Sequence, residues 1–379
     1  MVATLESANA SARSPADCNA GAVVVVAEAG VNHNGSLDVA RRLIDVAAES
    51  GADFVKFQSF RADQVAGAGA PKAQYQLATT GAAESQLEML HRLQLSEADH
   101  EVLFEHARSA GIGIFSTPFD LPSLRLLTAR FDVPVIKIPS GEITNGPFML
   151  EVARTGRRII LSTGMSSLAE VEAALSVLAF GYSCGSTVAA AGEQAFAAAF
   201  ASDAGQRQLR DKVTLLHCTT EYPAPFAETN LRAMDTLAAA FRLPVGFSDH
   251  TPGIHMAVAA VARGACLVEK HFTLDRSLPG PDHAASLEPQ ELATMVRNIR
   301  DVQVALGDGV KRATASELKN RVIARRSLVA AAPIRRGELF GTDNLACKRP
   351  GSGLSPMRYW QLLGTAASRD FDPDDTIGA

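Results

Sequence analysis

The sequence has few cysteines and lacks any long apolar run. Its five cysteines include no closely spaced pair, which argues against a disulfide framework or a zinc ribbon and is typical of reduced thiols in a cytoplasm. The apolar runs, such as AVVVVA, are too short to cross a bilayer. The first residues also lack the basic and then apolar segments of a secretory signal. We therefore expect a cytoplasmic protein with no membrane partner, and a mobile tail over residues 1–20.

A basic excess is absent as well. The formal net charge is −5, so we expect no nucleic acid among the partners. No GxxxxGK[ST] segment is present, which makes a nucleotide substrate a poor fit, and no GxGxxG turn follows the first apolar run. Hydrophobic residues make up 47% of the chain, enough for a sizeable core.

Short β-type runs alternate with helical patterns along most of the chain. The eight β-type runs are VVVVAEAG, ADFVKFQSF, IGIFSTPF, PVIKIPSGE, RRIILSTGM, KVTLLHCTTEYP, PVGFSDHTPG and ACLVEKHFT. This count predicts a (β/α)8 TIM barrel over residues 21–308, with a doubly wound open sheet as the alternative. Ser96 is the expected N-cap of one helix, with Asp99 at its third position. The Ala-rich stretch 180–212 reads as a helix plus an insertion of no obvious chemistry.

The composition and the residue pattern of the sequence change after the predicted barrel. Residues 309–326 are basic and polar and are expected to be a linker. Residues 327–379 contain short β-type pieces and many turns, which indicates a small second domain. A domain of that size has a marginal core by itself, so we expect it to rest on something larger.

Polar side chains stand at the carboxyl ends of all eight predicted strands, where barrels of this type carry their active sites. They include Glu28, Lys56, Gln58, Thr117, Lys137, Ser140, Glu142, Ser162, Tyr222, Ser248, His250 and His271. Serine and threonine donate hydrogen bonds and lysine supplies a point charge, so this ring predicts a pocket for a small phosphorylated metabolite.

Two successive strands each end in a histidine, His250 and His271. Neighbouring strands lie about 4.8 Å apart, so the two imidazoles could share one divalent ion that polarises a carbonyl group. A single histidine at a strand end is more often structural, but the pair favours a metal site. His91, His100 and His106 fall in a predicted surface helical region, where we expect them to be solvated.

Nine motifs in these regions resemble the sialic acid synthase family, in which a barrel precedes an antifreeze-like (SAF) domain. They are AEAGVNHNGSLDVA, GADFVKFQSF, FSTPFD, IKIPSGEITN, ILSTGMSS, LLHCTTEYPAP, GFSDHT, EKHFTLDRSLPGPDHAASLEP and KRPGSG, within residues 23 to 355. The resemblance implies condensation of phosphoenolpyruvate with the open-chain aldehyde of N-acetylmannosamine. The products would be N-acetylneuraminate and phosphate, released by C–O cleavage.

The resemblance also implies roles for individual residues. A divalent metal, Mn²⁺ first and Mg²⁺ or Co²⁺ as alternatives, would be held by His250 and His271. The catalytic residues would be Glu28, Tyr222 and Asp282. The substrate-binding residues would be Lys56, Gln58, Thr117, Lys137, Ser140, Glu142, Ser162, Ser248 and Arg349. The family is a domain-swapped homodimer, so Arg349 would reach the N-acyl group of the sugar in the partner's barrel.

Three other functions stay open at this point. The same chemistry on a 2,4-diacetamido-2,4,6-trideoxy-mannose would give N,N'-diacetyllegionaminate. A Schiff-base aldolase would use Lys137 or Lys270. A non-enzymatic reading makes the small domain a carbohydrate-binding module on an inactive barrel. Two departures from the family bear on the sugar: Thr220 stands where some members have Asn, and a sugar-contacting Asn of some members has no clear counterpart in residues 61–95.

Overall fold

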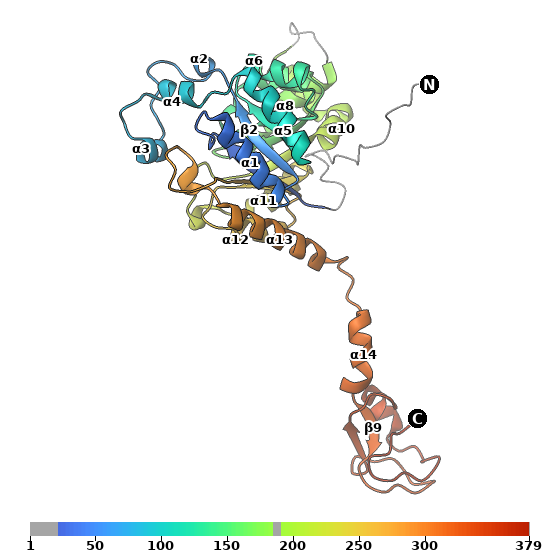
Figure 1. Ribbon diagram of the computed structural model, residues 1–379. Coiled ribbons are helices and arrows are strands. Elements are labelled where there is room, and N and C mark those ends of the chain that lie inside the picture. The colour runs from blue at the N-terminus through green and yellow to red at the C-terminus, as the bar shows by residue number, and fades with distance from the viewer. Residues whose placement is uncertain (1–21, 185–190, 379) are drawn as a thin grey trace, which may run out of the picture. The chain divides into compact units, whose positions relative to one another are not determined.

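The computed structural model describes residues 22–184 and 191–378 and divides the chain into two compact units, Met1–Gly307 and Asp308–Ala379 (Figure 1). The tail expected over residues 1–20 lies outside the described residues. The predicted linker, residues 309–326, falls within the second unit and contains helix α14, Ala315–Ala324. Among the described residues, no helix is both long and apolar enough to cross a membrane.

The first unit is built on eight parallel strands that form one continuous sheet. They are β1 Val24–Gly30, β2 Phe54–Ser59, β3 Gly113–Pro118, β4 Val135–Ile138, β5 Arg158–Ser162, β6 Val213–His217, β7 Val245–Asp249 and β8 Leu267–His271. The strand order is β3-β2-β1-β8-β7-β6-β5-β4, and the end strands β3 and β4 contact each other. This order closes the (β/α)8 TIM barrel that the sequence predicted and excludes the open doubly wound sheet.

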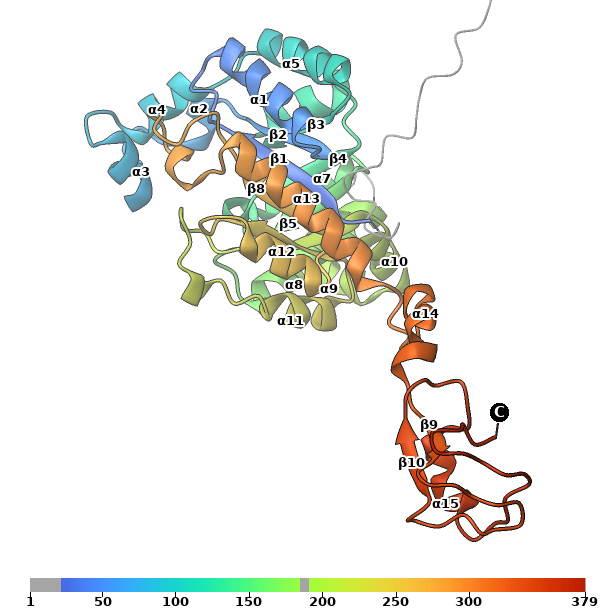
Figure 2. The ribbon, with the colours of Figure 1, turned by 60° about the horizontal axis from the view of Figure 1, so that its bottom comes forward.

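Helices surround the barrel (Figure 2). Those that follow the strands are α1 Leu37–Glu49, α5 Glu97–Ala110, α6 Leu121–Arg125, α7 Gly146–Arg154, α8 Leu168–Cys184, α11 Ala233–Phe241, α12 His255–Ala262 and α13 Pro289–Leu306. Each presents an apolar stripe to the sheet, as a helix at a sheet face must. Helix α5 begins at the predicted cap, where Ser96 Oγ accepts from the Asp99 N–H at 3.1 Å and the Asp99 carboxylate accepts from the Ser96 N–H.

Two insertions interrupt this regular pattern. Residues 61–95, between β2 and α5, form three short helices: α2 Ala62–Val65, α3 Gln74–Thr80 and α4 Gln86–Leu93. After α8 the chain adds α9 Glu193–Ala201 and α10 Asp203–Lys212, and α9 packs against α8. Residues 185–190 of the Ala-rich stretch lie outside the described residues.

The barrel interior is layered because side chains alternate along each strand. Its lower layer is an apolar cluster of Val24, Val26, Phe54, Phe115, Val135, Ile160, Leu216 and Leu267. Two residues further along these strands, the inward side chains become polar, as at Glu28, Lys56, Lys137, Ser162 and Glu269. The apolar layer therefore lies directly below a polar layer at the carboxyl ends of the strands and keeps water out from beneath it.

The second unit has its own small core. Strand β9, Ser327–Ala330, pairs antiparallel with β10, Leu345–Lys348, and helix α15 spans Tyr359–Leu362. The core consists of Leu328, Ala330, Ile334, Phe340, Leu345, Ala367, Phe371 and Ile377. In the unit taken by itself, α14 has no buried residue.

Gly246 on β7 gives a test of the packing inside the barrel. A Cβ atom there would clash with the Leu267 carbonyl oxygen and lie 2.7 Å from Leu216 Cδ2. We expect Gly246→Ala to lower the free energy of unfolding by about 1–3 kcal/mol through overpacking, measured by urea unfolding. Gly146→Ala is the control, because nothing lies within 4 Å of a Cβ at that first residue of α7. Equal urea midpoints for the two variants would contradict the packing described for the interior.

Candidate active site

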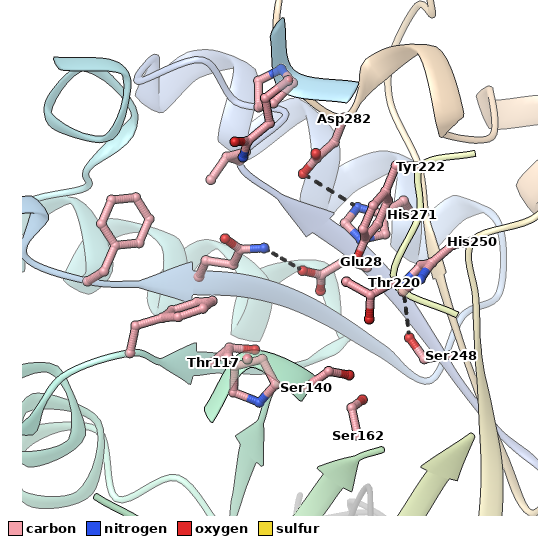
Figure 3. Close-up of a pocket in the computed structure, with 18 of the residues that line it drawn as sticks. Glu28, Thr117, Ser140, Ser162, Thr220, Tyr222, Ser248, His250, His271 and Asp282 are labelled. Carbon is pink, nitrogen blue, oxygen red and sulfur yellow. Dashed lines mark hydrogen bonds and ion pairs between the residues drawn. The ribbon is translucent and has the colours of Figure 1, made fainter. Parts of the chain in front are cut away.

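A cavity of about 260 Å³ opens at the carboxyl ends of the barrel strands (Figure 3). It is lined by twelve of the fourteen predicted site residues: Glu28, Lys56, Gln58, Thr117, Lys137, Ser140, Ser162, Tyr222, Ser248, His250, His271 and Asp282. The other two lie elsewhere. Glu142 ends a short 3-10 turn after β4 and accepts a hydrogen bond from Asn145 Nδ2 at 2.6 Å, outside the lining. Arg349 is an exposed residue of the second unit.

Two lysines and two glutamates form a buried ion-pair network at the base of the cavity. Lys56 Nζ lies 2.7 Å from Glu28 Oε2 and 3.6 Å from Glu269 Oε2. Lys137 Nζ lies 3.5 Å from Glu269 Oε1. All four side chains are at most 5% exposed. Glu269 therefore holds both lysines, and it is a cavity residue to which the sequence analysis gave no role.

Hydroxyl groups complete the base of the cavity around this network. Lys56 Nζ donates to Thr117 Oγ1 at 2.9 Å, and Lys137 Nζ donates to Ser162 Oγ at 2.8 Å. Ser248 Oγ donates to Glu269 at 2.8 Å. The hydroxyl of Thr220 is buried at the same cavity without a hydrogen-bond partner, so it is available to a ligand. This is the donor-rich surface that a phosphate or carboxylate requires.

Burial and neighbouring charges separate the pKa values of the two glutamates. Burial raises the pKa of Glu28 to about 7, against the opposing effect of Lys56. Burial would also raise the pKa of Glu269, but Lys137 and Lys56 outweigh it and lower that pKa to about 2. Burial lowers the pKa of Lys137 more than Glu269 raises it. Glu28 can therefore exchange a proton near neutral pH, whereas Glu269 stays charged.

The two predicted metal ligands face the same cavity, with ring centroids 5.7 Å apart. His250 Nδ1 donates to the Thr219 carbonyl at 2.6 Å, which leaves Nε2 with a lone pair. His271 Nδ1 is buried without a hydrogen-bond partner and lies 3.9 Å from Asp282 Oδ2. Burial lowers the pKa of both histidines, that of His250 to about 4, so both rings are neutral, the form that binds a metal.

The two histidines are the residues of this cavity that would hold a divalent ion if one bound here. Among the described residues, no group of three or more His, Cys, Asp or Glu side chains is arranged to hold a metal. The histidine pair would supply two ligands, and substrate or water would supply the others, as at catalytic rather than structural sites.

Aromatic ring contacts connect the histidines to helix α3. The Tyr222 ring lies 4.1 Å from that of His250 and 5.5 Å from that of His271, centroid to centroid. Tyr75 of α3 also contacts Tyr222, with the ring centroids 4.9 Å apart and the rings tilted. Tyr75 also lines the cavity. The sequence pattern of residues 61–95 did not indicate Tyr75 as a site residue, because that segment has no regular periodicity from which a buried helix face could be predicted.

Two expectations from the sequence need correction. Lys270, a candidate Schiff-base lysine, is fully buried outside the cavity lining and pairs with Asp249 Oδ2 at 3.0 Å. Strand alternation explains this, because Lys270 points away from the side that bears Glu269 and His271. His100, expected to be solvated, is 3% exposed and lies 2.7 Å from Ser59 Oγ. It is on the face of α5 that packs against the barrel.

Removing the carboxylate charge of Glu269 tests the network. We expect Glu269→Gln to destabilise the ligand-free protein by roughly 3 kcal/mol, because two buried lysines lose their shared partner. Phosphoenolpyruvate, the anion that the family resemblance implies, should then raise the unfolding temperature of the variant more than that of the unchanged protein. Thermal unfolding with and without this ligand measures both effects, and Glu172→Gln, at an exposed position of α8 outside the lining, is the control. An unchanged unfolding temperature in Glu269→Gln would show that the lysines do not depend on this carboxylate.

Comparisons with known proteins agree on one family. A family model described as the NeuB family matches residues 43–311, and one described as the SAF domain matches residues 325–379. The chain is 50% identical over 354 residues to the N,N'-diacetyllegionaminic acid synthase of Campylobacter jejuni subsp. jejuni, covering 93% of this chain and 98% of that protein. It is 42% identical to the N,N'-diacetyllegionaminic acid synthase of Legionella pneumophila, covering 93% and 92%.

A solved structure places the fold in the same group. The N-acetylneuraminic acid synthetase of Leptospira borgpetersenii, in complex with citrate, superposes with a TM-score of 0.63 at 31% identity, covering 79% of this chain and 90% of that one. The family match extends over more than half of the chain, and the relatives are synthases, so the reading of an inactive barrel is wrong. The chain is an enzyme that belongs to the NeuB family, with a SAF domain at its carboxyl end.

Proposed function

We propose that this enzyme condenses phosphoenolpyruvate with the open-chain aldehyde of an N-acylated amino sugar to give a nonulosonate and phosphate. One observation carries the proposal: two buried lysines with a ring of hydroxyls share a cavity with two neutral, facing histidines. The first group suits an enol phosphate, and the second suits activation of a carbonyl beside it.

The lysine and hydroxyl groups would hold phosphoenolpyruvate. Lys56 and Lys137 supply point charges, and Thr117, Ser162 and Ser248 already lie within hydrogen-bond distance of the network. Ser140 Oγ accepts from the Gly164 N–H at 3.0 Å, which fixes its oxygen at the cavity edge. Holding the ligand in this frame would orient its C3 carbon toward the histidine side, and such positioning lowers the barrier of a two-substrate reaction.

The proposed reaction balances without a redox partner. C3 of phosphoenolpyruvate attacks the aldehyde carbon, and a proton adds to the resulting alkoxide. Water adds at C2 and loses a proton. The tetrahedral intermediate then expels phosphate by breaking the bond between C2 and the phosphate oxygen, and the C2 hydroxyl passes its proton to the departing phosphate to leave the 2-keto group. Glu28 is the group suited to accept a proton from this water, since its pKa of about 7 makes it a base of matched strength.

The metal remains part of the proposal. His250 and His271 would hold a divalent cation through their neutral imidazole nitrogens, and the family resemblance puts Mn²⁺ first with Mg²⁺ or Co²⁺ as alternatives. When bound there, the ion would supply Lewis-acid polarisation of the aldehyde oxygen.

For the sugar we propose a 2,4-diacetamido-2,4,6-trideoxy-mannose, so that the product is N,N'-diacetyllegionaminate. Two relatives with this product in their names are 50% and 42% identical to this chain, whereas the human N-acetylneuraminate-9-phosphate synthase is 31% identical. N-acetylmannosamine, the first expectation from the sequence, is the alternative to be tested beside it.

A phosphate-release assay tests the reaction, the sugar and the metal together. With phosphoenolpyruvate and Mn²⁺, we expect release with the diacetamido sugar at least about 10-fold faster, by kcat/KM, than with N-acetylmannosamine. Chelation or His250→Ala should lower kcat/KM by about 100-fold or more, because the aldehyde is no longer polarised. Undiminished turnover in His250→Ala would discard the metal assignment, and borohydride trapping of Lys137 with pyruvate would favour an aldolase instead.

We also propose that the enzyme is a domain-swapped homodimer in which Arg349 acts on the partner's barrel. Partly apolar surfaces of the second unit support an assembly: Val322 and Ile323 of α14 are 53% and 69% exposed, and Trp360 is 72% exposed. Buried interfaces are enriched in such side chains.

Mixing two inactive variants tests this arrangement. An Arg349→Ala chain and a Lys137→Ala chain, refolded together into verified heterodimers, should regain roughly a quarter to a half of the unchanged activity, because one of the two sites is intact. Activity no higher than that of either variant by itself would count against a contribution from the partner chain.

A further inference from the structure

One side of the active-site cavity is apolar, in contrast to its polar base. Residues 61–95 form this side through Val65 at the end of α2 and through Met89, Leu90 and Leu93 of α4. Val31 and Phe60 adjoin them from the loops after β1 and β2. These six side chains are here called the apolar wall. Four of them, Val31, Phe60, Met89 and Leu93, pack as a cluster separate from the barrel core.

The polar base and the histidines limit which part of the sugar can meet this wall. The base suits phosphoenolpyruvate, and the histidines with Glu28 suit the aldehyde end of the sugar, so that end must lie beside the strand ends. The opposite end of the open-chain sugar then extends toward the remaining side of the cavity. That side is the apolar wall.

We infer that the apolar wall receives the C6 methyl group of a 6-deoxy sugar and so determines which sugar the enzyme takes. This inference rests on the proposed function, whose sugar was chosen from the relatives and not from the cavity. A methyl group against these side chains gains apolar burial. A C6 hydroxyl in the same place would lose water without an assured partner.

The other groups at this side of the cavity are uncharged. Gln76 and Gln86 lie among the lining residues, and Gln76 Oε1 accepts from the Ala73 N–H at 3.0 Å. Side-chain amides suit the N–H and C=O of an acylamino group, so they are compatible with the 4-acetamido group next to the methyl end. A sugar with a charged far end would find no counter-charge in this part of the lining.

Leu90 is the wall residue best suited to a test. Met89 and Leu93 are each 1% exposed and belong to the small core, so changing them would disturb the fold. Leu90 is half-buried and borders both that core and the cavity. Leu77 on α3 offers a matched control, because it is 38% exposed, belongs to the same insertion and lies outside the cavity lining.

The experiment compares two sugars that differ only at C6: N-acetylmannosamine and its 6-deoxy analogue. The unchanged enzyme should prefer the 6-deoxy sugar by about 10- to 100-fold in kcat/KM, the range for one such group in an apolar pocket. Leu90→Gln, which keeps the side-chain length but adds an amide, should reduce this preference about 10-fold. The KM for phosphoenolpyruvate should not change, and Leu77→Gln should leave every value unchanged.

A milder substitution in the wall, Val65→Thr, controls for disruption of α4 by the glutamine of Leu90→Gln. Val65→Thr is close to isosteric and lies at a position that is 38% exposed, and it should reduce the 6-deoxy preference in the same direction by a smaller factor. Two results would overturn the inference that the wall selects the sugar, but not the proposed condensation. One is an unchanged preference in both wall variants. The other is a preference of the unchanged enzyme for N-acetylmannosamine over its 6-deoxy analogue. A failure to release phosphate with the 2,4-diacetamido sugar, as well as with these two sugars, would overturn the proposed function and the inference about the wall with it.

Discussion

The active end of this barrel depends on a balance of four charges buried together. Glu28, Lys56, Lys137 and Glu269 come from β1, β2, β4 and β8, and each by itself would be costly to remove from water. Together they neutralise one another above the apolar layer that excludes water from below. An entering anion must disturb this balance. Glu269 keeps its charge and holds the lysines in place, whereas Glu28, whose pKa is near 7, can exchange a proton.

Much of this site could be predicted because strands alternate and barrels collect their chemistry at one end. Regular alternation places Lys56, Lys137 and Ser162 inward, and all three line the cavity. The same rule, applied strictly to ACLVEKHFT, separates Glu269 and His271 from Lys270. This parity excludes Lys270 as a catalytic lysine and places Glu269 at the cavity, so both positions could be predicted from the sequence.

Other features could not be predicted because they depend on packing that no local pattern records. His100 has the polar neighbours of a surface residue, yet α5 turns it toward Ser59 and away from water. Glu142 follows the strand that carries Lys137, but the turn at Ser140 directs its carboxylate to Asn145. A motif identifies which side chains are present, but the backbone that follows a strand end decides where each one points.

The cavity combines two kinds of scaffold, and this explains how reaction and selectivity can be separated. The polar base stands on strands that are hydrogen-bonded to neighbours and buried, which fixes their side chains. Four of the six wall residues stand on the short helices α2 and α4, and the buried residues of the wall pack in a cluster separate from the barrel core. Such a segment can change with little effect on the barrel core. The ring contacts of Tyr75 with Tyr222, and of Tyr222 with His250, join the two parts. A change of sugar can therefore arise in the insertion, provided that these contacts beside the histidines are kept.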